Sequence, residues 1–79
     1  MTNLEKYNNA FTKVFAVETT VLNDNFSKES VNEWDSVHQL NIVANIEEDF
    51  DIMLEPEDIM EFTSYEVGKN ILSKYNIKL

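Results

Sequence analysis

The scarcity of glycine and proline restricts this chain more than any other feature of its sequence. Among 79 residues there is one glycine, Gly68, and one proline, Pro56. These two residue types are the ones that most often interrupt helices and form tight turns. Apolar and polar residues do not alternate over any long segment, so strands are disfavoured as well. The sequence therefore predicts an all-α fold.

The length and the absence of cysteine limit the type of protein. We expect residues 1–79 to form a single domain, near the lower size limit for a core without cross-links. With no cysteine, neither disulfides nor a thiolate zinc site can form, which fits a reducing compartment. The first ten residues are polar, unlike a signal peptide, and no apolar run approaches the ~20 residues that span a bilayer. We expect a soluble, cytoplasmic protein.

Acidic residues dominate the charge of the chain. Fifteen acidic side chains against six lysines, with no arginine, give a net charge of −9. Such a surface repels nucleic acids and anionic membranes, so we expect neither as a partner. It attracts basic patches on other proteins and accelerates encounter with them. An equally good interpretation is that the charge only keeps a small protein soluble.

The spacing of apolar residues predicts a helix at the start of the chain, followed by a long connection. The helix is expected over residues 3–15, with its apolar side made by Leu4, Tyr7, Phe11, Val14 and Phe15. The connection, Ala16–Trp34, is rich in Thr, Ser, Asn and Asp. Connections of this length are uncommon in compact domains and often carry a function. The residues expected to attach it to the core are Val21, Leu22 and Phe26.

Three further helices are expected after this connection. The second begins at Asp35 or Ser36, either of which can cap it, and runs to about Asp49. Its apolar side is expected to consist of Val37, Leu40, Val43, Ala44, Ile46 and Phe50. Pro56 suits the first turn of a short third helix. The chain is thus expected to form a small four-helix bundle with a long loop between its first two helices and a short third helix.

A capping-box pattern predicts where the fourth helix begins. Thr63 is followed three residues later by Glu66, the spacing at which the two side chains can satisfy each other's backbone amides. The helix is expected to end near Tyr75. The residues expected to face inward from it are Tyr65, Val67, Ile71, Leu72 and Tyr75. Aromatic residues expected to be structural are Phe11, Phe15, Phe50, Phe62 and Tyr75.

Few residues of the chain have catalytic chemistry. There is one histidine, and cysteine and arginine are absent. A serine–histidine–acid triad would have to use Ser36 and His38. Two positions apart on a helix, these side chains point about 200° away from each other. We therefore expect a non-catalytic protein.

The carboxylates between residues 47 and 61 suggest a calcium site, but their spacing is wrong for one. An EF-hand loop that began at Asp49 would need an oxygen ligand at Met53 and a glycine at Leu54. It would also need its closing glutamate at Met60. We expect no specific metal site, while weak and diffuse binding of divalent ions to these acids remains open.

The segment around the Asp-Ser pair has a composite pattern. Trp34-Asp35-Ser36-Val37 is followed by Leu40, Ile42-Val43, Ile46, Glu47-Glu48, Phe50 and Asp51-Ile52. This spacing resembles the acyl carrier protein family, whose hallmark is Asp-Ser-Leu and then an amphipathic helix that ends in acid-acid-x-Phe-x-Ile. The motif covers about Trp34 to Leu54, and the order of elements matches over the whole chain. The resemblance implies a four-helix bundle of acyl-carrier type, with 4′-phosphopantetheine attached to Ser36.

The resemblance also implies roles for the residues around Ser36. Asp35 would help a phosphopantetheinyl transferase to recognise the site, or it would simply cap the helix. The helix that follows would be the docking surface for partner enzymes. Its acidic stretch, Glu47, Glu48 and Asp49, would pair with basic residues of the partners, or form an ordinary solvated face. Val37 would make apolar contact with partners, or pack in the core.

Two positions depart from the family pattern. Carriers of primary fatty-acid synthesis commonly have acids two and five residues after the serine, where this chain has His38 and Asn41. This difference favours a dedicated pathway with its own loading enzyme and downstream acyltransferase or synthase. We count both residues with the docking surface. His38 is expected to be an exposed helical residue, with a pH-sensitive partner contact as the alternative.

Two functions from different classes remain. The first is a monomeric carrier that holds an acyl or aminoacyl thioester on a phosphopantetheine arm at Ser36. The second is a small acidic helical adaptor that binds a basic protein without a prosthetic group. Replacement of Ser36 by alanine separates them, because an adaptor tolerates the change and a carrier does not.

Overall fold

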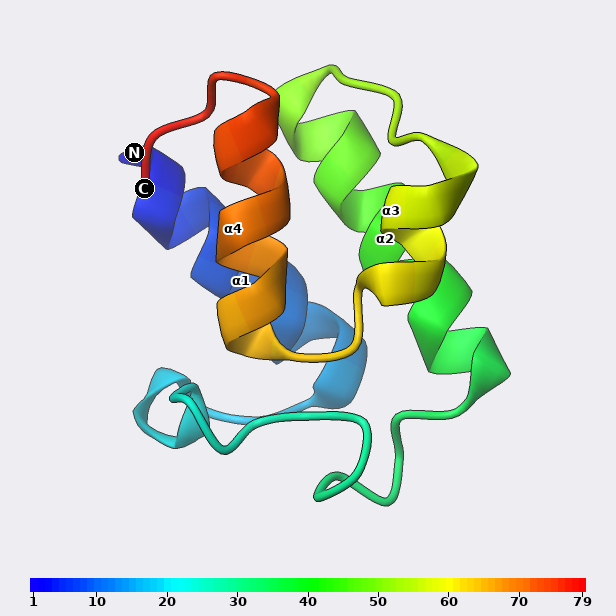
Figure 1. Ribbon diagram of the computed structural model, residues 1–79. Coiled ribbons are helices and arrows are strands. Elements are labelled where there is room, and N and C mark those ends of the chain that lie inside the picture. The colour runs from blue at the N-terminus through cyan, green and yellow to red at the C-terminus, as the bar shows by residue number, and fades with distance from the viewer.

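The protein is all-helical, as the sequence predicts. The computed structural model describes residues 1–79 and contains no β-strand. Its elements in chain order are α1 (Asn3–Phe15), the 3₁₀ turn η1 (Thr19–Val21), α2 (Ser36–Phe50), α3 (Pro56–Glu61) and α4 (Tyr65–Lys74) (Figure 1). The expected ends of α2 and α4 differ from the observed ones by one residue. None of the helices has both the length and the apolar character needed to span a bilayer.

The helices form a small bundle with the long connection across one end. α1 packs against α2, α4 lies beside α1, and α3 lies beside α2 (Figure 1). The two termini meet, since the Asn3 side-chain amide donates a hydrogen bond to the carbonyl oxygen of Lys78 at 3.0 Å. They lie at the end of the molecule away from the start of α2 (Figure 1). The N-terminus of α2 is therefore clear of both chain ends.

An aromatic cluster around Phe11 forms the centre of the core. Phe11 is fully buried. Its ring centroid lies within 6.2 Å of those of Tyr7, Phe15, Phe26, Trp34, Phe62 and Tyr65. These rings come from α1, the long connection, the end of α3 and α4, so a single side chain holds these segments together. Phe15 and Phe62 are buried as expected, whereas Phe50 and Tyr75 are only half-buried.

The inward face of α2 agrees only in part with the sequence prediction. Val43 and Ile46 are buried as expected, together with Ile42, while Val37, Leu40 and Ala44 are exposed. Both sets recur at helical spacing, so periodicity alone cannot distinguish them. Gln39 determines which side of α2 faces the core. Its side-chain amide donates hydrogen bonds to backbone carbonyls at the end of α3, and this turns the Ile42–Ile46 side inward. The prediction that Val37, Leu40 and Ala44 face the core was wrong. On α1, Leu4 is likewise exposed.

The long connection is attached to the core by residues near its end. Phe26 is buried and Leu22 is half-buried, as expected, but Val21 is exposed. Trp34, which the sequence did not indicate as a core residue, is only 3% exposed. Its ring packs against Phe11, Phe15 and Phe26. The residue just before the Asp-Ser pair is therefore held in the aromatic cluster.

The N-terminal cap of α4 lies one residue later than predicted. Ser64, not Thr63, accepts the hydrogen bond from the amide of Val67, at 2.9 Å. The shift follows from a short strand-like pairing with the connection, in which the Lys28 amide bonds to the Thr63 carbonyl and the Tyr65 amide to the Phe26 carbonyl. This pairing holds Ser64 in the extended conformation that a cap needs. A capping box does occur on α1, between Thr2 and Glu5.

A buried carboxylate joins α3 to α4. Asp58 is the only buried charged residue of the chain. It accepts hydrogen bonds from the Lys74 ammonium at 2.5 Å and from the Tyr75 hydroxyl at 2.6 Å. The same hydroxyl accepts a hydrogen bond from the amide of Glu55 at 2.8 Å. This network fixes the first turn of α3 against the last turn of α4.

The Asp58 network predicts how stability responds to acid. Hydrogen bonds from Lys74 and Tyr75 hold the pKa of Asp58 below its ordinary value. Its contribution is therefore complete above the ordinary carboxyl pKa of about 3.9 and is lost as the pH falls through the lower pKa of the folded state. We expect Asp58→Asn to melt below the wild type at about pH 7, with a difference that narrows toward about pH 2. Thermal melts followed by circular dichroism test this, and a difference independent of pH would contradict it.

Gly68 gives a second stability prediction. A Cβ at this position would lie 2.2 Å from the Tyr7 hydroxyl oxygen and 2.6 Å from Cζ of Phe62. Tyr7 cannot move freely, because its hydroxyl donates to the Tyr65 carbonyl at 2.6 Å. Gly68→Ala should thus destabilise the fold by about 1–3 kcal/mol although alanine favours helices. Asn70→Ala, at an exposed position of α4, is the control. In a urea titration it should leave the free energy of unfolding unchanged.

Candidate functional site

Asp35 caps the N-terminus of α2. Its backbone is extended, with φ −99° and ψ −171°, and its Oδ1 accepts a hydrogen bond from the amide of His38 at 2.9 Å. Ser36 is consequently the first residue of the helix. The sequence left open which of the two residues is the cap, and the structure assigns that position to Asp35.

Ser36 is presented to solvent at the positive end of a 15-residue helix. The first amides of a helix have no carbonyl partner within the helix, and the aligned peptide dipoles place partial positive charge there. An anion attached to the Ser36 hydroxyl would lie in a favourable field. The site combines an accessible nucleophilic oxygen with a location that stabilises a phosphate.

His38 makes a second bond to the same carboxylate oxygen. Its Nδ1 lies 2.9 Å from Oδ1 of Asp35. Its ring stacks on Phe15 of α1, with centroids 5.4 Å apart and planes at 20°. The expectation of an exposed helical residue was therefore wrong, since the imidazole is half-buried between α1 and the cap. The hydrogen bonds from the backbone and side chain of His38 lower the pKa of Asp35.

Trp34 and Gln39, which sequence reasoning missed, connect the site to the core. The Trp34 indole Nε1 donates to Oε1 of Gln39 at 2.6 Å. The Gln39 amide nitrogen donates in turn to the carbonyl oxygens of Ile59 and Phe62, both at 2.8 Å. One polar side chain thereby connects the residue before the cap to α3. One feature of the sequence could have indicated the role of Gln39. It lies at helical spacing from Ile42 and Ile46, at a position where an apolar residue is usual.

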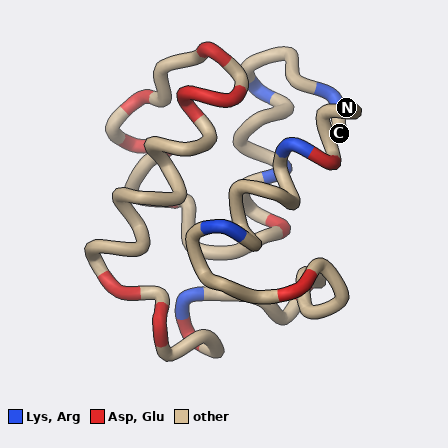
Figure 2. The backbone as a smooth tube through the Cα atoms, turned by 180° about the vertical axis from the view of Figure 1, so that it is seen from behind, with Lys and Arg blue, Asp and Glu red and all other residues tan.

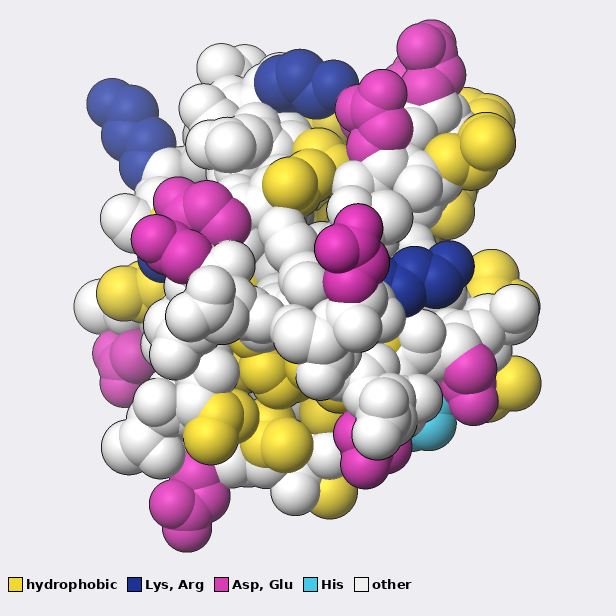
Figure 3. Space-filling view, turned by 60° about the horizontal axis from the view of Figure 1, so that its bottom comes forward, with side chains coloured by type: hydrophobic (Ala, Val, Ile, Leu, Met, Phe, Trp, Pro, Cys, Tyr) yellow, Lys and Arg dark blue, Asp and Glu magenta, His cyan; other side chains and the backbone are white.

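Exposed apolar side chains follow Ser36 on α2. Val37 is 63% exposed and Leu40 is 65% exposed. α3 adds Met60, which is 80% exposed. On the face that carries the long connection, other hydrophobic side chains also lie exposed between acidic ones (Figure 3). Val37 is therefore free to contact a partner, and the alternative that it packs in the core is wrong.

The acidic stretch at the end of α2 does not form one patch. Oε2 of Glu47 accepts a hydrogen bond from the amide of Leu54 at 2.8 Å, so this carboxylate closes the α2–α3 loop. Asp49 points toward α1. Glu48 is exposed, as is Asn41 earlier on the helix. Consecutive residues on a helix lie about 100° apart, which is why the three acids point in three directions.

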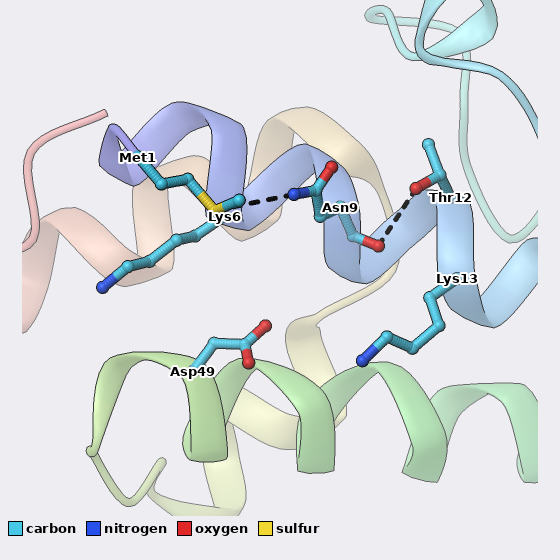
Figure 4. A pocket seen from close by; sticks show the side chains of 6 residues that line it. All are labelled: Met1, Lys6, Asn9, Thr12, Lys13 and Asp49. Carbon is cyan, nitrogen blue, oxygen red and sulfur yellow. Dashed lines mark hydrogen bonds between the residues drawn. The ribbon is translucent and has the colours of Figure 1, made fainter.

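A shallow groove separates α1 from α2 beside Asp49. It encloses about 500 Å³ and is lined by Met1, Lys6, Asn9, Thr12, Lys13 and Asp49. The two lysines reach from α1 toward α2, and Asp49 reaches back from α2 (Figure 4). The Lys6 ammonium also lies 5.5 Å from the centroid of the Phe50 ring. The groove places opposite charges across the α1–α2 contact.

Charge is distributed unevenly over the molecule. Eight carboxylates lie between residues 47 and 61, a range without lysine. Four of the six lysines lie on α1 and α4, at Lys6, Lys13, Lys69 and Lys74 (Figure 2). No three acidic or histidine side chains converge in an arrangement that would hold a metal ion.

Comparison with protein-family models, with curated proteins and with solved structures gave no significant match. The chemistry of the site therefore has to be inferred from its residues. Those residues are an exposed serine at the first position of α2, a carboxylate that caps the helix, and an imidazole bound to that carboxylate.

The acidic segment predicts a dependence of stability on ions. Of its eight carboxylates, Glu47 and Asp58 accept hydrogen bonds from other parts of the chain. The exposed remainder repel one another. We expect the melting temperature to rise with moderate salt or millimolar Mg²⁺, because ions screen this repulsion. In the double variant Glu57→Gln with Glu61→Gln, the melting temperature should rise less on these additions. A wild-type melting temperature that changes with neither salt nor Mg²⁺ would contradict the prediction.

Proposed function

We propose that this chain is a carrier protein of the acyl-carrier type, modified at Ser36 with 4′-phosphopantetheine. The observation that carries the proposal is the arrangement at the start of α2, where Asp35 caps the helix and Ser36 follows it with an exposed side chain. The sequence pattern from Trp34 to Leu54 supports it, as does an all-helical fold with a long first connection and a short third helix.

The residues present fit such a group. A phosphodiester on Ser36 would adjoin the N-terminus of α2, where helix amides and the dipole favour negative charge. The arm supplies a terminal thiol that carries an acyl or aminoacyl group as a thioester. The chain itself would hold the arm and deliver the cargo to enzymes that dock nearby. A tether of this kind raises the effective concentration of its cargo at a docked enzyme.

The surface around Ser36 suits docking of partner enzymes. Val37 and Leu40 offer exposed apolar contact close to the modified serine. Asn41 and Glu48 are exposed further along the same helix. The net charge of −9 would steer basic patches of a transferase, a loading enzyme or an acyltransferase toward this protein. Neutral Asn41 and half-buried His38 replace the usual acids, which favours service to a dedicated pathway.

The adaptor function is the second candidate. The exposed side chains of Val37, Leu40 and Met60, together with the acidic surface, would suit a basic partner that has an apolar pocket. An adaptor would use this surface without any modification of Ser36. The two functions therefore differ in a single measurable event, the attachment of the arm.

The intact mass of the purified protein tests the proposal. We expect wild-type protein, incubated with coenzyme A, Mg²⁺ and a broad-specificity phosphopantetheinyl transferase, to gain one phosphopantetheine. Ser36→Ala should gain none. Ser73→Ala, at another exposed helical serine, is the matched control and should be modified like the wild type. Folded, unmodified wild-type protein that gains no mass with two different transferases would favour the adaptor.

A further inference from the structure

The Asp35 side chain is held by one residue through two donors. The backbone amide and the Nδ1 of His38 both lie 2.9 Å from the same oxygen, Oδ1. Because an ionised carboxylate only accepts hydrogen bonds, the imidazole must carry its proton on Nδ1 in this contact. The backbone amide of Val37 adds a weaker interaction with the carboxylate. Both short hydrogen bonds end on Oδ1, so Oδ2 can accept a hydrogen bond from a partner protein.

The imidazole is itself fixed from the opposite side. It stacks on Phe15, whose ring packs against Trp34 with centroids 5.0 Å apart. Trp34 precedes Asp35 in the chain and is buried. The cap residue is therefore held twice, through its backbone by Trp34 and through its side chain by His38, and both supports rest on the same aromatic cluster.

We propose that His38 is a positioning residue for the modification of Ser36. Its imidazole orients the Asp35 carboxylate so that Oδ2 is presented to donor groups of the modifying enzyme beside the Ser36 hydroxyl. This inference rests on the proposed function. It gives His38 a role inside the chain, in place of the direct partner contact that its position on the docking helix suggests.

Preorganisation is the physical reason for the effect. An exposed aspartate with only the backbone cap bond can leave that geometry, and the enzyme must then order it during binding. A charge-assisted bond from a stacked imidazole removes that cost beforehand. If His38 instead contacted the modifying enzyme directly, the rate would depend on the imidazole ring itself. A variant that lacks the ring but keeps a hydrogen-bond donor therefore distinguishes the positioning role from a direct contact.

Three variants test the proposal by measuring kcat/KM for phosphopantetheinylation. His38→Leu removes the donor and should lower kcat/KM on the order of tenfold, the size of one charge-assisted hydrogen bond. His38→Asn removes the ring but keeps a nitrogen donor at the place of Nδ1, so it should restore the rate to within about threefold of the wild type. Asn70→Leu, at an exposed position of α4, should match the wild type.

Carboxyl-detected NMR of the unmodified chain provides a readout that needs no transferase. The pKa of Asp35 lies below its ordinary value, first because of the hydrogen bond from the His38 backbone amide and next because of the bond from its imidazole. The pKa should rise in part in His38→Leu, which loses only the imidazole bond, and stay low in His38→Asn. His38→Gln, which places its amide beyond the Nδ1 position, replaces the leucine variant if that one does not fold.

The outcomes separate this inference from the proposed function. Wild-type protein that is never modified overturns both. Wild-type protein that is modified, with His38→Leu modified equally fast, overturns only the role of His38. His38→Asn as slow as His38→Leu also overturns it, because the imidazole would then act by direct contact.

Discussion

The packing of aromatic rings around Phe11 is the interaction on which the rest of the fold depends. In 79 residues without disulfides, the core has to be built from few and large side chains. Phe11 touches rings from the long connection, from the end of α3 and from α4, which are far apart in the sequence. The connection would otherwise be a costly, unattached loop. Its end is held by Trp34, so α2 begins at a defined place.

The aromatic cluster also holds the residues around Ser36 in place. Trp34 anchors the backbone before the cap, Gln39 ties the next turn of α2 to α3, and Phe15 supports the imidazole of His38. Ser36 itself remains exposed. A carrier needs this combination, since the attachment point must be easy to reach while its surroundings stay constant for each enzyme in turn. The proposed function rests on this geometry at the start of α2.

Local signals predicted the helices and the candidate serine, whereas tertiary contacts decided the rest. Helix ends follow from caps, proline and periodicity, which are encoded within a few residues. The inward face of α2 also depends on Gln39 and on carbonyls twenty or more positions away. Periodicity therefore placed Val43 and Ile46 correctly in the core but wrongly added Val37, Leu40 and Ala44. The α4 cap moved to Ser64 because the connection pairs with that segment. Phe15, on which the imidazole of His38 stacks, likewise lies outside the pattern that singled His38 out.

The meeting of the two termini, at the end away from Ser36, has a consequence for how this fold can be used. A polypeptide attached at either end would leave the molecule from the same corner, well clear of the start of α2 (Figure 1). Domains whose termini adjoin tolerate insertion into other chains and rejoining of their ends. The same bundle can therefore serve alone, as a module within a longer polypeptide, or tethered to a surface with its serine facing outward.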